Sequence, residues 1–226
     1  MNKIPSSTPL GKEEKPSAAE TLLYIALKYK TAIIGALVLI VCLGGGTFFW
    51  MRQQQASEQE AALQLSRVTP ALGVGNYQVA IFGEGKVLGL KKIAAQYSAT
   101  PSGKMATLLL ANAYFSVGEF DSALKVFKTL SIADNDLAAA GLAGTAACYS
   151  NKNQFALAAE NYQAASAKAE NKALKAQYLA HAGESYQQAI ELKKASDLFT
   201  KVIADYPGST GAALSQRSLW QISGNL

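Results

Sequence analysis

The chain has 226 residues, which is enough for one domain and an additional segment. Half of the residues are hydrophobic and only 16% are charged, a composition typical of a chain with one segment in lipid. The net charge of +5 comes from scattered lysines and arginines without interleaved aromatic residues, which argues against a nucleic-acid-binding protein.

Residues 1–30 are rich in polar side chains and contain Pro5, Pro9 and Pro16. A segment with so few apolar side chains does not form a core, so we expect a disordered tail. This tail contains five lysines, whereas residues 51–80 contain two arginines. Basic residues stay on the cytoplasmic side of a membrane span, so the tail is predicted to be cytoplasmic.

Residues 31–51 contain no charged side chain. A helix of this length rises about 31 Å, close to the roughly 30 Å hydrocarbon core of a bilayer. A cleaved signal peptide would have a shorter apolar stretch. A lipoprotein signal would need a small residue before Cys42, where Val41 stands. We therefore predict an uncleaved transmembrane helix over residues 31–51, with the lipid bilayer as its partner.

Residues 52–86 follow the predicted span. They are expected to form a membrane-proximal helix from Gln53 to Leu65 and then a glycine-rich linker. Residues 87–226 are predicted to be a repeat domain that opens with a helix from Val87 to Tyr97, the remnant of an earlier repeat unit.

Five columns of similar residues recur in this domain at spacings of 35 and then 37 residues. Chance rarely keeps five columns in register, so the domain is predicted to consist of repeated units. The columns are Tyr114, Tyr149 and Tyr186; Ala123, Ala158 and Ala195; Phe127, Tyr162 and Phe199; Phe120, Phe155 and Leu192; and Ala111, Ala146 and Gly183.

Each unit is predicted to be a pair of helices, because apolar residues recur at helical spacing on both sides of a break such as Gly118. The units span residues 104–136, 139–171 and 176–208, and a helix over 209–222 is expected to cap the stack. In the third unit Ile190 stands where a turn glycine is expected, which predicts that the first helix there runs long.

The units resemble the tetratricopeptide repeat, whose signature places a leucine, a small residue, a tyrosine, an alanine, an aromatic residue and a closing proline at fixed offsets. Pro207 closes the third unit, whereas Asn135 and Glu170 stand at that offset in the first two. The first copy reads Leu110-Ala111, Tyr114, Ala123 and Phe127.

The whole layout resembles a class of bacterial inner-membrane proteins with a short cytoplasmic tail, one span and a tetratricopeptide-like periplasmic domain. This class includes the ancillary subunit of the Sec translocon. The resemblance implies an all-α fold with a transmembrane helix, an α-hairpin solenoid and a C-terminal capping helix. It also implies a scaffold that binds the Sec translocon, periplasmic chaperones or nascent secreted chains. A scaffold for division or outer-membrane biogenesis is the alternative.

In tetratricopeptide domains the first helices of the units line a groove that holds a peptide. The resemblance implies a neutral, shallow groove suited to permissive contact with an extended or helical segment; simple solvation of these side chains is the alternative. A clamp for a terminal carboxylate is not expected, because Leu108 stands where a lysine would be needed. The candidate groove residues are Leu108, Asn112, Phe115, Asn151, Gln177, Glu184 and Gln187, accompanied by Ser116, Ala143, Ala147, Ser150, Ala180 and Gln188.

No pattern in the sequence points to catalysis. His181 is the single histidine and has no clustered acid or cysteine in the sequence, so a structural or surface role is expected. Cys42 and Cys148 are expected to stay unpaired. The acids Asp134 and Asp136 are expected to cap a helix that begins near Leu137. We therefore predict a protein-binding scaffold that is not an enzyme and has no cofactor, metal or small-molecule substrate.

Overall fold

The computed structural model describes residues 17–223, without the side chains of residues 20, 26, 33, 36, 37 and 40. Apart from one short hairpin of strands, the described elements are helices, so the predicted all-α class is confirmed. The chain forms two compact units, Met1–Gln53 and Gln54–Leu226. The predicted tail lies outside the described residues up to residue 16.

The first unit contains helix α1 (Ala18–Lys28) and the beginning of helix α2 (Lys30–Gly73), within which the boundary between the units falls. The prediction of a disordered tail is therefore wrong for Ala18–Lys28, which forms a helix. This stretch is mostly apolar and contains no proline or glycine to interrupt a helix. The larger apolar side chains described in this unit, such as Leu22 and Val41, are exposed. Among the residues that the structure describes, no helix is both long and apolar enough to cross a membrane.

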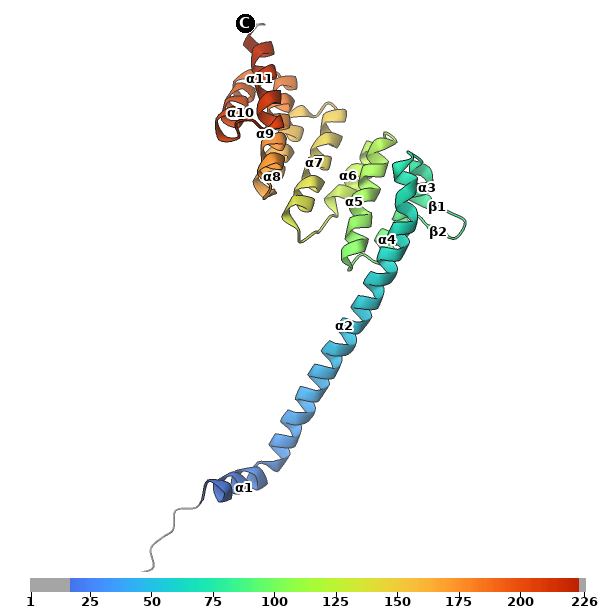
Figure 1. Cartoon of the computed structure of the whole chain (residues 1–226), viewed down its shortest axis with the longest axis vertical. Coiled ribbons are helices and arrows are strands. Elements are labelled where there is room, and N and C mark those ends of the chain that lie inside the picture. The colour runs from blue at the N-terminus through green and yellow to red at the C-terminus, as the bar shows by residue number, and fades with distance from the viewer. Residues whose placement is uncertain (1–16, 224–226) are drawn as a thin grey trace, which may run out of the picture. The chain divides into compact units, whose positions relative to one another are not determined.

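The second unit continues from Gln54 as a series of short elements (Figure 1). After α2 they are α3 (Tyr77–Phe82), β1 (Gly83–Glu84), β2 (Val87–Leu88), α4 (Leu90–Gln96), α5 (Pro101–Ser116), α6 (Phe120–Lys128), α7 (Asn135–Asn151), α8 (Phe155–Lys168), α9 (Lys172–Gln188), α10 (Leu192–Asp205) and α11 (Thr210–Ser223).

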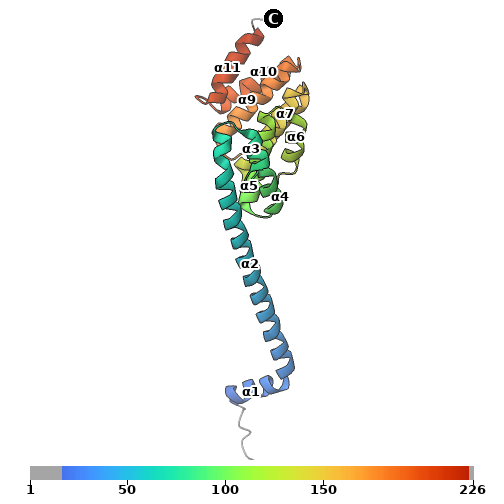
Figure 2. The same ribbon diagram turned by 90° about the vertical axis from the view of Figure 1, so that its right-hand side faces the viewer.

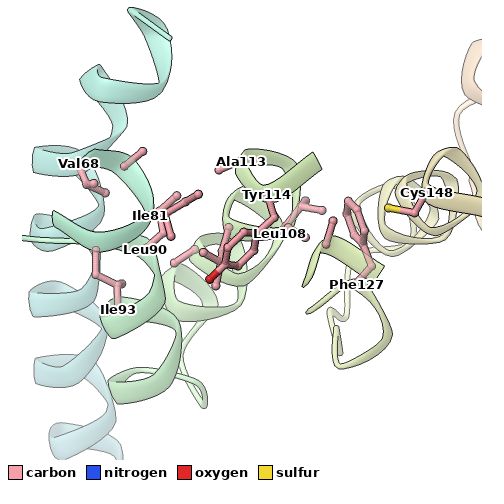
Figure 3. Close-up of a cluster of buried hydrophobic side chains, with 14 residues drawn as sticks. Val68, Ile81, Leu90, Ile93, Leu108, Ala113, Tyr114, Phe127 and Cys148 are labelled. Carbon is pink, nitrogen blue, oxygen red and sulfur yellow. The ribbon is translucent and has the colours of Figure 1, made fainter. Parts of the chain in front are cut away.

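The region predicted as a membrane-proximal helix and linker is part of the core of the second unit. Val68 of α2, Ile81 of α3 and Leu90 and Ile93 of α4 pack with side chains of α5 (Figure 3). In both ribbon views, α3 lies beside the last turns of α2 (Figure 2), and both α3 and α4 contact α5. The expected boundary between residues 86 and 87 therefore does not separate two bodies, because both sides of it contribute to one apolar cluster.

The predicted helix from Val87 to Tyr97 is shorter than expected. Val87 and Leu88 pair as an antiparallel strand with Gly83 and Glu84, and the helix begins only at Leu90. A Cβ on Gly89 would lie 2.3 Å from the backbone nitrogen of Gly83. Only glycine allows the backbone at residue 89 to approach the backbone at residue 83 so closely. Because of this close approach, α4 begins at Leu90 and not at Val87.

From α5 onward the helices pair as α5–α6, α7–α8 and α9–α10, and α11 follows the last pair (Figure 1). The three first helices have matching N-terminal caps: Thr100, Asp134 and Asn171 accept hydrogen bonds from backbone N–H groups of the first turn. The predicted capping role of Asp134 is confirmed by its 2.8 Å bond from the Leu137 N–H, although α7 begins earlier, at Asn135.

Neighbouring pairs are also joined at their turns. Asp136 Oδ1 accepts hydrogen bonds from the backbone N–H groups of Glu170 and Asn171, at 2.7 and 3.1 Å. The side chains of Asn135 and Glu170 form a further hydrogen bond of 2.6 Å. These two residues occupy the repeat position that proline has in the third unit, so the exits of the first two units are tied to each other.

Two residues after the end of the first helix of each pair, the backbone has a positive φ angle. These residues are Gly118, Asn153 and Ile190, with φ of 80°, 58° and 63°. Helix α9 therefore ends at Gln188 and does not run long, contrary to the prediction. The backbone adopts the left-handed turn even without a glycine, because the second helix must return against the first.

Replacing Ile190 with glycine should raise the free energy of unfolding by about 1 kcal/mol, since a β-branched residue is strained in the left-handed region. Its side chain is 82% exposed, so its removal takes little packing away. Urea titration of the full chain in detergent, followed by circular dichroism, would measure the change. Gly118→Ala is the converse control and should lower stability, while a destabilising Ile190→Gly would contradict the strain.

Candidate functional site

An open cleft of 330 Å³ lies among helices α7, α8, α9 and α11, and we call it the polar cleft. All nine of its lining side chains carry a hydroxyl, amide, carboxylate or imidazole group. They are Ser150, Tyr162, His181, Glu184, Ser185, Gln187, Gln188, Ser218 and Gln221. These groups give the polar cleft many hydrogen-bond donors and acceptors.

The helical register of α9 explains why its polar residues face the cleft. His181, Glu184 and Gln188 follow one another at spacings of three and four residues, which places them on one face of the helix. The small residues Ala182 and Gly183 lie on another face and are buried. A Cβ on Gly183 would lie 2.4 Å from the ring of Phe199, so close packing against α10 fixes the rotation of α9.

His181 and Glu184 form the central pair of the cleft. The imidazole Nδ1 lies 2.9 Å from Glu184 Oε2, and the ring of Tyr162 lies 5.4 Å from the imidazole, centroid to centroid. Burial raises the pKa of the Tyr162 hydroxyl to about 12, with a smaller contribution from the negative charge of Glu184. Tyr162 therefore stays protonated at neutral pH and can donate a hydrogen bond to a ligand.

The cleft has the chemistry of a binding surface for neutral or positively charged polar groups. Glu184 is the acidic residue of its lining, and none of the nine described lining residues is a lysine or an arginine. Glutamine side chains both donate and accept hydrogen bonds, as the peptide backbone does. The arrangement can therefore pair with the main chain of a polypeptide without requiring a particular sequence.

The structure brings two of the seven predicted groove residues, Glu184 and Gln187, into the polar cleft, together with Ser150 and Gln188. Leu108 is the clearest error, because it is 6% exposed and belongs to the core cluster of Figure 3. Its side chain belongs to a cluster that also contains residues of α2, α3 and α4, whereas the repeat register predicted exposure to solvent.

The other predicted groove residues lie outside the lining of the cleft. Phe115 is half-buried and packs edge-to-face on Phe120, with ring centroids 5.3 Å apart. Asn151 is exposed, and its side chain donates a 3.0 Å hydrogen bond to the Ala147 carbonyl one turn earlier. Asn112 and Gln177 are exposed. None of these four side chains lines the polar cleft with Glu184 and Gln187.

Several cleft residues were not predicted as site residues. Tyr162 was identified only as a member of a repeat column, and His181 was expected to have a structural or surface role. Ser218 and Gln221 come from α11, which was expected only to cap the stack. The three-residue spacing of His181 and Glu184 was a usable signal in the sequence, since it places the two side chains on one helical face.

The cysteines do not contribute to this site. Both are free; Cys42 is exposed and Cys148 is buried in the core. Burial raises the pKa of the Cys148 thiol to about 11, although nearby Lys152 acts in the opposite direction. The thiol is therefore protonated at neutral pH and is a poor nucleophile. In residues 17–223 no group of three or more potential metal-ligating side chains lies together.

No protein-family model, curated protein or solved structure matches the chain. The function must therefore be inferred from its own residues and fold. The two features that bear on it are the polar cleft and the apolar segment before the second unit.

Proposed function

We propose that the protein is a membrane-anchored scaffold that binds a segment of another polypeptide in the polar cleft and has no catalytic role. The observation that carries this proposal is the convergence of hydrogen-bonding side chains from α7, α8, α9 and α11 on one open cleft. A polypeptide in an extended or helical form presents the donors and acceptors that such a lining can satisfy.

The tetratricopeptide-like repeat supports the same proposal. Helical hairpins of this kind stack through nearest-neighbour contacts and leave broad surfaces free for partners. The recurrent small residues support this interpretation, since Ala111, Ala123 and Ala158 are fully buried where helices meet. Because the repeat is shared by many functions, it supports binding as such and not a particular partner.

Residues 31–51 are proposed to be the membrane anchor. The support comes from the sequence, which has no charge in this segment, and from the exposure of its described apolar side chains, among them Val38, Leu39 and Leu43. Apolar surface of this extent is unfavourable in water and favours lipid. Thr47 donates its hydroxyl to the carbonyls of Leu43 and Gly44 at 2.9 Å, which satisfies its polar group within the helix.

The lysines before the anchor favour a cytoplasmic N-terminus, which would place the repeats in the periplasm of a bacterial inner membrane. By resemblance, the first partners to test are the Sec translocon, periplasmic chaperones and nascent secreted chains. An accessory role in translocation or in handover to chaperones would use weak, permissive binding. A scaffold for division or outer-membrane biogenesis is the second candidate, since the same cleft would serve it equally.

A photo-crosslinking amino acid at Gln188, on the exposed rim of the cleft, should capture Sec subunits, periplasmic chaperones or nascent secreted chains in intact cells. The expected result is a product specific to this position, identified by mass spectrometry. The matched control is Thr200, an exposed residue of α10 outside the cleft lining.

Equal products from both positions would contradict binding in the polar cleft. Capture of division or outer-membrane biogenesis proteins alone would favour the second candidate. Release of the protein from membranes by alkaline carbonate would contradict the anchor while leaving the binding proposal intact.

A further inference from the structure

Two adjoining cavities lie on another part of the second unit. One of 340 Å³ is formed by α4, α5 and α6, and one of 470 Å³ is formed by α6, α7 and α8. Both are lined by Leu130 and Ser131, which follow α6, so the two cavities adjoin at these residues. We call the pair of adjoining cavities the basic groove. It shares no lining residue with the polar cleft.

The two halves of the groove are built from equivalent positions of successive repeats. Leu110 and Val126 line the first cavity, and Thr145 and Asn161, each 35 residues later, line the second. The groove is therefore a product of the repeat and not an accidental hollow. A partner that contacts one half could therefore contact the equivalent repeat positions in the other half.

The floor of the groove is apolar. Leu110, Val126 and Leu130 form it in the first half, and Phe127 and Leu142 contribute to it in the second. Leu130 packs closely on Gly141, where a Cβ would lie 3.1 Å from Leu130 Cδ2. Apolar side chains of a partner would lose contact with water on this floor, which is favourable.

The rim of the groove is positively charged. Lys91, Lys104, Lys128 and Lys168 come from four different helices, α4, α5, α6 and α8. The described lining of both halves contains no aspartate or glutamate. None of the four lysines forms an ion pair with a described carboxylate. The Lys128 ammonium group instead lies 5.4 Å from the centroid of the Tyr149 ring.

We propose that the basic groove docks a segment of a partner protein in which large apolar side chains alternate with aspartate or glutamate residues. Charge complementarity identifies this occupant, since four lysines without lining acids would attract carboxylates and repel a basic segment. An occupant must supply apolar side chains for the floor as well as negative charges for the rim. A peptide can supply both, whereas a phosphate ion or a lipid headgroup has no apolar side chains. Each cavity lies in the size range of small ligand sites.

This docking site is independent of the polar cleft. The cleft has one acidic residue and no basic one among its described lining residues, whereas the groove has the opposite charge. The two sites would therefore select segments of different composition. Such a chain can hold two segments at once, which is the property that a scaffold requires.

Binding of a fluorescein-labelled peptide made of three Leu-Leu-Asp-Glu repeats to the full chain in phosphatidylcholine nanodiscs tests this site by fluorescence anisotropy. Ala95→Trp fills the first cavity from an exposed position of α4, and it should weaken binding about tenfold. The double variant Lys91→Glu and Lys104→Glu should weaken it at least as much, and added salt should weaken binding to the original chain.

The matched controls are Ala213→Trp, at an exposed position of α11 outside the groove, and the double variant Lys193→Glu and Lys201→Glu on α10, which makes the same charge change elsewhere. Both should bind the peptide as the original chain does. Circular dichroism would verify that every variant is folded.

Four results would overturn the proposal: no binding of the acidic peptide, equal binding by the groove variants and their controls, equal binding of a peptide with lysine in place of each acid, or lysine-dependent capture of phosphatidylglycerol vesicles in place of the peptide. The last result would assign the groove to a membrane surface. Crosslinking from Gln188 is unaffected by any of these results, so the two proposals fail separately.

Discussion

Replacing Phe199 with alanine should lower the free energy of unfolding of the second unit by about 3–5 kcal/mol. Phe199 is 0% exposed and is the largest fully buried side chain in the described part of the chain. Its ring packs with Ala159, Tyr186 and Ile222, so it joins α8, α9 and α11 through α10. Alanine would leave a cavity among four helices, and their backbones cannot collapse independently to fill it.

Urea titration of the full chain in detergent, followed by circular dichroism, would measure this loss. Phe82→Ala is the matched control, because it makes the same change at a side chain that is 53% exposed. The control should shift stability by well under half as much. Equal effects of the two substitutions would mean that α10 does not pack on α9 and α11 as the structure shows, and the polar cleft would then lack its support.

The repeated columns of the sequence predicted that the domain is helical and roughly where the turns between helices lie. They could do so because each column has a packing role, and that role determines its residue type. Ala111, Ala123 and Ala158 are small where helices meet, and Phe127 and Phe199 are large where they fill space. Asp134 was recognised as a cap from its place before an apolar run. Such local features are readable because the physics that selects them acts within a few residues.

Features that depend on distant contacts were not readable in the same way. Leu108 has the register of a groove residue, yet it is buried in a core cluster that also contains Val68 and Ile81 from elements before the repeats. Ile190 adopts a left-handed backbone conformation because α10 must pack on α9. An isoleucine otherwise prefers a negative φ angle. The polar cleft needs Ser218 and Gln221 from α11, and no spacing within α9 indicates which helix will face it.

The basic groove is another feature that local sequence patterns did not predict. Its lysines lie far apart in the sequence, where they form no basic cluster. Four of them gather on one groove only after α4, α5, α6 and α8 are packed. The apolar floor could not be predicted either. Leu130 lies after the end of α6, in a segment that the sequence indicates only as a loop between two helices.

Replacing Ala123 with phenylalanine should lower the free energy of unfolding by about 3 kcal/mol, near the upper end of overpacking effects. Ala123 of α6 and Ala111 of α5 are each 0% exposed and belong to one core cluster. A ring at residue 123 has no space between the two helices, so α5 and α6 would have to separate. Thermal unfolding of the full chain in detergent would show a lower midpoint.

Ala164→Phe is the control, because it adds the same ring at an exposed position of α8. Its midpoint should stay close to that of the original chain. If Ala123→Phe left the midpoint unchanged, the register between α5 and α6 would be different from the one described. Val126 and Leu130 lie one and two turns beyond Ala123, so the floor of the basic groove depends on this same register.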